Sequence, residues 1–176
     1  MTYLKITNIE EFKRVLNFAF SDAYENLKES EKNIIRNQII SAISEIDDAQ
    51  NILIKKVKTD LKELLSSGSS TTKNRILFVF NMISENDKFN IISEYITNEN
   101  NIRNYHRLDE DILIPMLDNL SNDLKIEVIS KSDSVELFRF MGKLNELAKD
   151  RERLYLKDRR KYAKYYEICQ KALAIK

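Results

Sequence analysis

The sequence predicts an all-α fold, on the strength of three observations. Only two glycines, Gly68 and Gly142, and one proline, Pro115, occur in 176 residues, which disfavours turn-rich β folds and suits long helices with short links. Apolar residues recur along most of the chain at the spacing of amphipathic helices. Two stretches between Ile76 and Ile129 also echo each other as helix, polar turn and helix. We expect about seven to eight helices, the last of them long and amphipathic.

Three amphipathic helices are expected before residue 66. Asn8 and Glu11 have the spacing of a capping box at the start of the first helix. The second helix should begin after Ser30, and the third should follow Asp47 and Asp48, since acidic side chains stabilise helix N-termini. The expected inner faces are Phe12, Leu16, Phe20, Ala23 and Leu27 in the first helix, Ile35, Ile39, Ala42 and Ile46 in the second, and Leu53, Val57, Leu61 and Leu64 in the third.

The segment Ser66 to Thr72 contains only serine, threonine and glycine, the composition of a flexible connector. The residues before it supply only three helices, so we expect a single domain, 1–176, with a mobile loop at 66–72. A division into an N-terminal part, 1–65, and a helical-hairpin part, 73–176, is left open.

The central echo indicates paired helices. Residues 83–93, ISENDKFNIIS, match residues 120–130, LSNDLKIEVIS, if one residue is allowed to drop out. A weaker copy is expected at Ile43-Ser44-Glu45, which gives a period of roughly 37 to 40 residues, as in helical-pair repeats. The pattern resembles, in architecture alone, an α-solenoid of HEAT or armadillo type, which implies a stacked binding surface and no particular ligand. We therefore expect stacked helical hairpins, as a short α-solenoid-like or irregular bundle, with Ile92 and Ile129 buried at equivalent positions.

A proline and a glycine stand inside two of the helices predicted further along the chain. A proline beyond the first turn removes a backbone hydrogen bond, so the helix around Pro115 should start near Leu113 or be kinked. Ser132 can cap the next helix, in which Gly142 marks either a close helix crossing or an accidental glycine. The expected inner face of that helix is Val135, Phe138, Met141 and Leu144.

The C-terminal helix, 150–176, divides apolar from basic side chains. At 100° per residue one stripe contains Tyr155, Tyr162, Tyr166, Cys169 and Leu173, and the opposite side carries Arg153, Lys157, Arg160, Lys164 and Lys171. From Lys149 to Lys176, ten Lys and Arg residues against four Asp and Glu residues give a net charge of +6. Because the whole chain carries +1, residues 1–148 carry −5. The five basic residues are the candidate partner-binding site.

Enzyme signatures are missing from the sequence. It contains no glycine-rich nucleotide loop, nucleophile elbow or zinc-protease motif. His106, the single histidine, is expected to be exposed and non-catalytic, and Cys169 is expected to pack in the core. The acidic groups Asp47-Asp48 and Asp109-Glu110-Asp111 precede apolar helical runs, so capping is favoured over metal binding. No catalytic residue, cofactor or metal site is predicted.

The favoured function is a non-enzymatic protein-protein interaction module, such as an adaptor, inhibitor or host-interacting factor, whose partner is another protein, an acidic one in one interpretation. Alternatives left open are a nucleic-acid-binding protein using the basic C-terminal helix, an enzyme with an unrecognised site, and homo-oligomer formation. With no apolar signal core and no run that could span a bilayer, we expect a soluble, cytoplasmic protein. Export by another route, or delivery into a host cell, is left open. Heavy use of Ile, Asn and Lys is typical of an AT-rich genome, including those of phages and pathogens.

Overall fold

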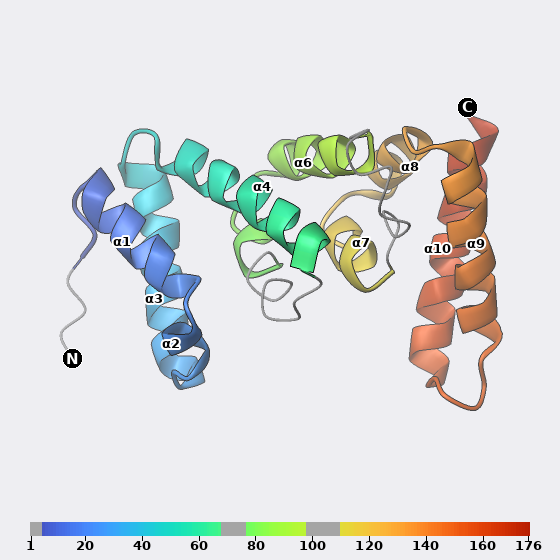
Figure 1. The fold of residues 1–176 in the computed structure, drawn as a ribbon, viewed down its shortest axis with the longest axis horizontal. Helices are drawn as coiled ribbons and strands as arrows, with labels where there is room; N and C mark the ends of the chain where they lie inside the picture. The colour runs from blue at the N-terminus through green and yellow to red at the C-terminus, as the bar shows by residue number, and fades with distance from the viewer. Residues whose placement is uncertain (1–4, 68–76, 98–109) are drawn as a thin grey trace. The chain divides into compact units, whose positions relative to one another are not determined.

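The computed structural model describes residues 5–67, 77–97 and 110–176, and every regular element in these ranges is an α-helix (Figure 1). The all-α prediction and the long C-terminal helix are confirmed. The described ranges contain ten helical segments, counting the turn at 77–80, instead of seven to eight, and the short α2, which divides the first predicted helix, was not expected. Apart from the turn at 77–80, the helices are α1 (Ile9–Ala19), α2 (Asp22–Glu25), α3 (Glu29–Glu45), α4 (Ala49–Ser67), α6 (Glu85–Thr97), α7 (Glu110–Leu117), α8 (Asn122–Ser130), α9 (Ser134–Lys149) and α10 (Leu156–Ala174).

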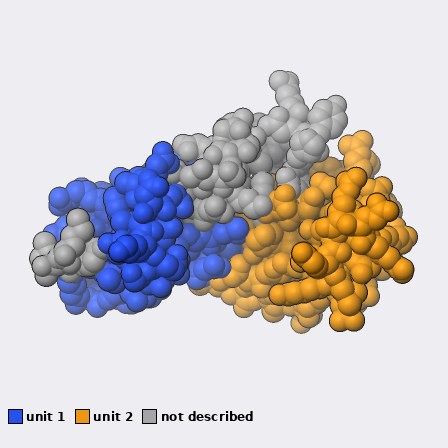
Figure 2. Space-filling model, turned by 90° about the horizontal axis from the view of Figure 1, so that it is seen from below, with its two compact units in different colours: residues 1–83 blue, residues 84–176 orange. Residues whose placement is uncertain are grey.

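Two compact units make up the chain, unit 1 at 1–83 and unit 2 at 84–176 (Figure 2). Of the predicted link 66–72, Ser66 and Ser67 form the end of α4, and 68–72 lie outside the described residues. The assignment of 1–176 to one domain stays a prediction.

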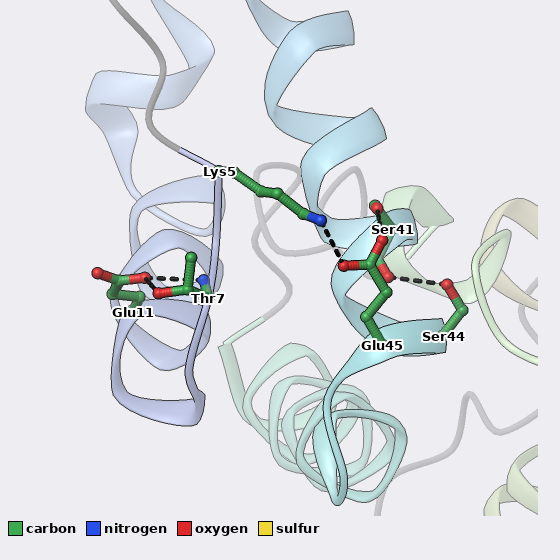
Figure 3. Close-up of polar contacts among 6 residues, drawn as sticks. All are labelled: Lys5, Thr7, Glu11, Ser41, Ser44 and Glu45. Atoms are coloured by element: carbon green, nitrogen blue, oxygen red, sulfur yellow. Dashed lines mark hydrogen bonds and ion pairs between the residues drawn. The ribbon is translucent and has the colours of Figure 1, made fainter.

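The start of α1 has the predicted cap. Asn8 Oδ1 accepts hydrogen bonds from the backbone N–H groups of Glu10 and Glu11, at 3.1 and 3.0 Å. Glu11 Oε2 accepts from the backbone N–H and the hydroxyl of Thr7, at 2.8 and 2.9 Å (Figure 3). These two bonds from Thr7 are the main reason that the pKa of Glu11 lies below its usual value. The spacing of Asn8 and Glu11 therefore did predict a helix start.

Glu45, the last residue of α3, holds the extended segment before α1. Lys5 Nζ lies 2.8 Å from Glu45 Oε2, and Ser41 Oγ donates to Glu45 Oε1 at 2.9 Å (Figure 3). The bond from Lys5 is the largest cause of the lowered pKa of Glu45. Ser44 Oγ donates to the Ser41 carbonyl oxygen within α3, so Ile43-Ser44-Glu45 lies inside a helix. The weaker third copy of the echo, which requires an inter-helix turn here, is wrong.

In unit 1, α1, α3 and α4 pack around a common core. Two predictions at the end of the first helix are wrong, because α1 ends at Ala19 and α2 follows a turn: Ala23 is exposed and Leu27 is only half-buried. Tyr24 is buried in their place, with its ring 5.5 Å from that of Phe78. Ile46 is half-buried, and the side chain of Leu64 lies outside the described part. The predicted core residues that are buried are Phe12, Leu16, Phe20, Ile35, Ile39, Ala42, Leu53, Val57 and Leu61.

In the echoed stretches of the chain, burial repeats at a spacing of 37 residues, with no gap required. α6 packs against α8, and the prediction that Ile92 and Ile129 are buried is confirmed. Pairs in which both members are buried are Val79 and Met116, Phe80 and Leu117, Ile83 and Leu120, Ile91 and Val128, and Ile92 and Ile129.

Contacts at both ends fix the relative direction of α6 and α8. At their first turns, Glu85 Oε1 accepts a hydrogen bond from the Ser121 backbone N–H at 2.7 Å. Lys131, the residue after α8, has its Nζ 4.2 Å from the centre of the Phe89 ring in the middle of α6, and donates to Ser93 Oγ, nearer the end of α6, at 3.3 Å. The N-terminal ends of α6 and α8 are in contact, and the residue after α8 contacts the later part of α6, so the two echoed helices run parallel.

Around Pro115 the helix α7 is already formed at Glu110, so the prediction of a late start near Leu113 is wrong. The Pro115 carbonyl oxygen accepts a bond of 2.9 Å from the side-chain amide of Asn119. This bond uses one of the carbonyl groups that a helix end leaves without a backbone partner.

Helix α9 begins one residue later than predicted, and of its four predicted inner residues Met141 and Leu144 are buried and two are not. Its N-cap is Asp133, whose Oδ1 accepts from the backbone N–H groups of Val135 and Glu136 at 2.8 and 3.2 Å. Ser132, the predicted cap, is buried and donates to the Ile129 carbonyl oxygen. Val135 and Phe138 are each 58% exposed, so their assignment to the core is wrong. The buried residues are Leu137, Phe140, Met141 and Leu144.

Candidate functional site

Helix α10 packs against α8 and α9, and its N-cap is Tyr155 (Figure 1). The predicted apolar stripe is right for the buried Cys169 and wrong for Tyr155, which is 83% exposed. At 100° per residue the observed buried face lies about 80° from the predicted stripe. Tyr162, Tyr166 and Leu173 are half-buried at its edge, and the buried residues are Tyr165, Ile168, Cys169 and Ala172.

The five predicted binding residues, Arg153, Lys157, Arg160, Lys164 and Lys171, are all exposed, and we call them the basic face. Arg153 precedes α10, and the other four lie on it. Their direction is about 100° from the buried face, so they flank that face and do not oppose it. None of the five forms an ion pair with any residue in the described ranges. The positive charges of the basic face are therefore not neutralised by carboxylates of the described residues and can bind an anionic group.

Lys161, which was not predicted as a site residue, has a fixed partner. Its Nζ lies 2.5 Å from Oδ2 of Asp118, the residue after α7. Asp118 Oδ1 accepts a hydrogen bond from Tyr165 Oη at 2.6 Å. Burial, and then this bond to a carboxylate, raises the pKa of Tyr165. Asp118 thus joins the end of α7 to two residues of α10.

Lys125 of α8 is the second basic residue that the sequence did not single out. It is only 7% exposed, and its Nζ lies 5.8 Å from the centre of the Tyr165 ring. Burial lowers the pKa of Lys125, and the nearby charges of Lys164 and Lys161 lower it further, against the opposing effect of Asp118. Lys125 of α8 is thus within electrostatic reach of two lysines of α10 and of the Asp118 carboxylate.

Helical spacing could have identified Lys161, which stands three or four residues from Lys157 and Lys164. No local signal identifies Lys125, because its place beside α10 depends on the packing of α8.

Sulfur and acid chemistry were the other candidates. Cys169 is fully buried, so its expected place in the core is confirmed. Because burial raises the pKa of this thiol to about 12, it is protonated at neutral pH. Glu110 pairs with Lys143 at 2.6 Å, and Asp47 and Asp48 are exposed. Within the described residues no three potential ligands gather as a metal site. His106 and Asp109 lie outside that part of the chain.

A groove of about 350 Å³ between α1 and α4 is a basic surface in unit 1, lined in part by Lys13, Lys55 and Lys56. Lys13 pairs with Glu10 at 2.7 Å, and Lys56 pairs with Asp60 at 3.3 Å. Since two of its three lysines already have carboxylate partners, this groove is a weaker candidate for an acidic ligand than the basic face.

Comparisons with known proteins give no functional lead. No family model matches the chain, and no curated protein or solved structure shows significant similarity to it. Of the helices in the described ranges, none combines the length and apolar content needed to cross a membrane.

Proposed function

We propose that this chain is a non-enzymatic protein-protein interaction module that binds an acidic partner protein through the basic face of α10. The observation that carries the proposal is that Arg153, Lys157, Arg160, Lys164 and Lys171 are exposed and form no ion pair in the described part of the chain. Lys161, on the same helix, has its carboxylate in Asp118. An acidic partner protein would supply carboxylates that pair with the five residues, as the Asp118 carboxylate pairs with Lys161.

Exposed apolar side chains favour a protein as the partner. In the described part of the chain eight large apolar side chains are exposed, and five of them belong to α9, to α10 or to residues adjoining α10: Val135, Phe138, Tyr155, Leu156 and Ile175. Burial of apolar surface drives protein association, and contiguous apolar exposure is typical of protein-binding surfaces. Tyr155 and Leu156 lie at one end of α10 and Ile175 at the other, so a partner along the basic face would meet both kinds of side chain.

The parallel course of α6 and α8 supports the stacked-hairpin arrangement as a further part of the proposal. Equivalent helices of successive repeats run parallel in α-solenoids and share one core. The five matched pairs of buried residues agree with such stacking. A stacked array of this kind would present α10 as its last helix, with one face free for a partner.

Nucleic acid is the second candidate, because lysines and arginines at helical spacing also suit phosphates. Single-stranded nucleic acid is usually held by stacking bases on exposed aromatic rings as well. Here Tyr165 is buried, with Lys125 Nζ 5.8 Å from the centre of its ring, whereas Tyr155 at the start of α10 is 83% exposed. Binding by charge, with Tyr155 as the exposed ring, would remain, which is why an oligonucleotide belongs in the test.

The experiment is a charge reversal of the basic face. Lys157, Arg160 and Lys164 are replaced together by Glu, and binding of a glutamate-rich peptide and of a single-stranded DNA oligonucleotide is measured against salt. Because exposed charges contribute little to folding, the melting temperature should hardly change. We expect the wild type to bind the peptide, and the variant to bind it at least about tenfold more weakly, a difference of roughly 1.4 kcal/mol.

The matched control replaces Arg14 and Lys28 of unit 1 and Arg139 of α9, which are also exposed, by Glu. It changes the net charge by the same amount and should keep the affinity of the wild type. Equal losses in both variants would show a response to net charge only. Tighter binding of the oligonucleotide than of the peptide would favour the second candidate, and wild type that binds no peptide would end the proposal.

A further inference from the structure

Where α8 packs against α10, the charges of Lys161, Lys164 and Asp118 all act on Lys125. Lys125 belongs to α8, Lys161 and Lys164 to α10, and Asp118 follows α7. Both oxygens of Asp118 already accept bonds, Oδ2 from Lys161 at 2.5 Å and Oδ1 from Tyr165 at 2.6 Å. Neither Lys125 nor Lys164 has a hydrogen bond or ion pair with a described residue. The four charged groups therefore carry a net charge of +2.

Lys125 is the unusual member of this cluster. A lysine that is 7% exposed normally pairs its charge, because burial of most of the side chain weakens the hydration of an unpaired ammonium at a cost in free energy, even where Nζ itself still reaches solvent. The face of the Tyr165 ring, 5.8 Å from Nζ, compensates only part of that cost. The repulsion from Lys164 and Lys161 adds to it. One anion placed between Lys125 and Lys164 would remove both penalties together.

We propose that Lys125 and Lys164 together receive a carboxylate group of the acidic partner, an Asp or Glu side chain that anchors it beside the basic face. This inference rests on the proposed function and names the atoms at its centre. The packing of Lys125 against Tyr165 holds its ammonium in place, and the exposed Lys164 closes on the anion from the solvent side. A preorganised charge loses less entropy on binding than a free surface lysine does.

The burial of Tyr165 favours a carboxylate over a nucleic acid as the group that Lys125 and Lys164 receive. A nucleic-acid phosphodiester carries one negative charge, as a carboxylate does, so charge alone does not separate the two. Because Tyr165 is buried, its ring is closed to a stacking base, and a nucleic acid would gain no stacking there.

The test follows Lys125 itself by NMR of the lysine side-chain Cε–Hε groups in the full chain. A glutamate-rich peptide is titrated in, and the signals of Lys125 and Lys164 should move and saturate together. Lys131 of unit 2, which already bonds to Ser93, is the internal reference and should move little. Lys125→Met keeps the apolar stem and removes the charge. It should weaken peptide binding by about tenfold or more, as for a charge pair removed from water, and Lys131→Met should not.

Each outcome decides a different claim. If charge reversal of the basic face abolishes peptide binding but the Lys125 signal stays still and Lys125→Met binds like wild type, the anchor is wrong and the proposed function stands. If the wild type binds no peptide, both fail. If a single-stranded oligonucleotide moves the Lys125 signal at lower concentrations than the peptide, the carboxylate assignment is overturned. Should Lys125→Met not fold, the titration of the wild type decides alone.

Discussion

Ile92 of α6 and Ile129 of α8 stand 37 residues apart in the chain, occupy the same position in the two echoed segments, and are both completely buried. Replacing either by Ala should lower the free energy of unfolding by about 2 to 5 kcal/mol, because each change removes methyl groups from a packed core and leaves a cavity. Urea denaturation measures the loss. The control is Val135→Ala, at an exposed position, which should stay within about 0.5 kcal/mol of wild type. A loss below about 1 kcal/mol at Ile92 or Ile129 would contradict the packing.

Tyr165 should carry most of the stability that the tyrosines of α10 supply. Tyr165→Ala should cost about 3 to 5 kcal/mol, the range for a large buried aromatic side chain. Tyr165→Phe keeps the ring and removes the hydroxyl, with its bond to Asp118 and a longer one of 3.4 Å to the Ile114 carbonyl oxygen, so about 1 kcal/mol should be lost. Tyr155→Ala is the matched control, since Tyr155 is exposed. If that control destabilised the protein as much as Tyr165→Ala, the buried face of α10 would be assigned wrongly.

Cys169 should be protected from alkylation in the native protein. Its thiol is fully buried, and burial raises its pKa to about 12, so little thiolate exists at pH 8. Iodoacetamide should therefore label it slowly in buffer and rapidly in denaturant, as counted by intact mass spectrometry. Complete labelling of folded protein within the time needed for the unfolded protein would be incompatible with a core position.

Acid should destabilise the cap of α9. Backbone N–H bonds from Glu136 and Val135 lower the folded-state pKa of Asp133. A lowered folded pKa gives stability that is present above the unfolded value, near 4, and is lost as the pH falls through the folded value. Asp133→Asn keeps an effective N-cap but does not titrate. Its stability should therefore fall less than that of wild type between pH 5 and strongly acidic conditions, in urea titrations at each pH. Identical pH profiles for the two proteins would count against this role of Asp133.

Local patterns in the sequence were sufficient for the all-α class, for most of the longer helices and for part of the core. Asn8 and Glu11 marked a helix start because a cap is made by residues three positions apart. α9, however, has apolar residues on two sides, and spacing alone does not say whether Val135 and Phe138 or Leu137 and Phe140 face inward. Its neighbour α10 decides that, through packing that no single-helix pattern contains.

The candidate site could likewise be predicted from the sequence only in part. The exposure of the basic face was predictable, since charged side chains clustered on one side of a helix are usually solvated. The direction of the buried face was not, because it depends on Tyr165 meeting Asp118, 47 residues earlier in the chain. Lys125 joins the lysines of α10 for the same reason, through contacts between helices.

Gly142, on the exposed side of α9, has no neighbouring atom of the described residues within 4 Å of the place where a Cβ would stand, so none of the described elements crosses α9 closely there. The glycine gives the helix no packing contact in return for its backbone freedom, which costs about 1 kcal/mol relative to alanine. The middle of α9 should therefore open more often than the middle of α10. Amide hydrogens around Gly142 should exchange with deuterium sooner than those around Tyr165, and Gly142→Ala should slow that exchange.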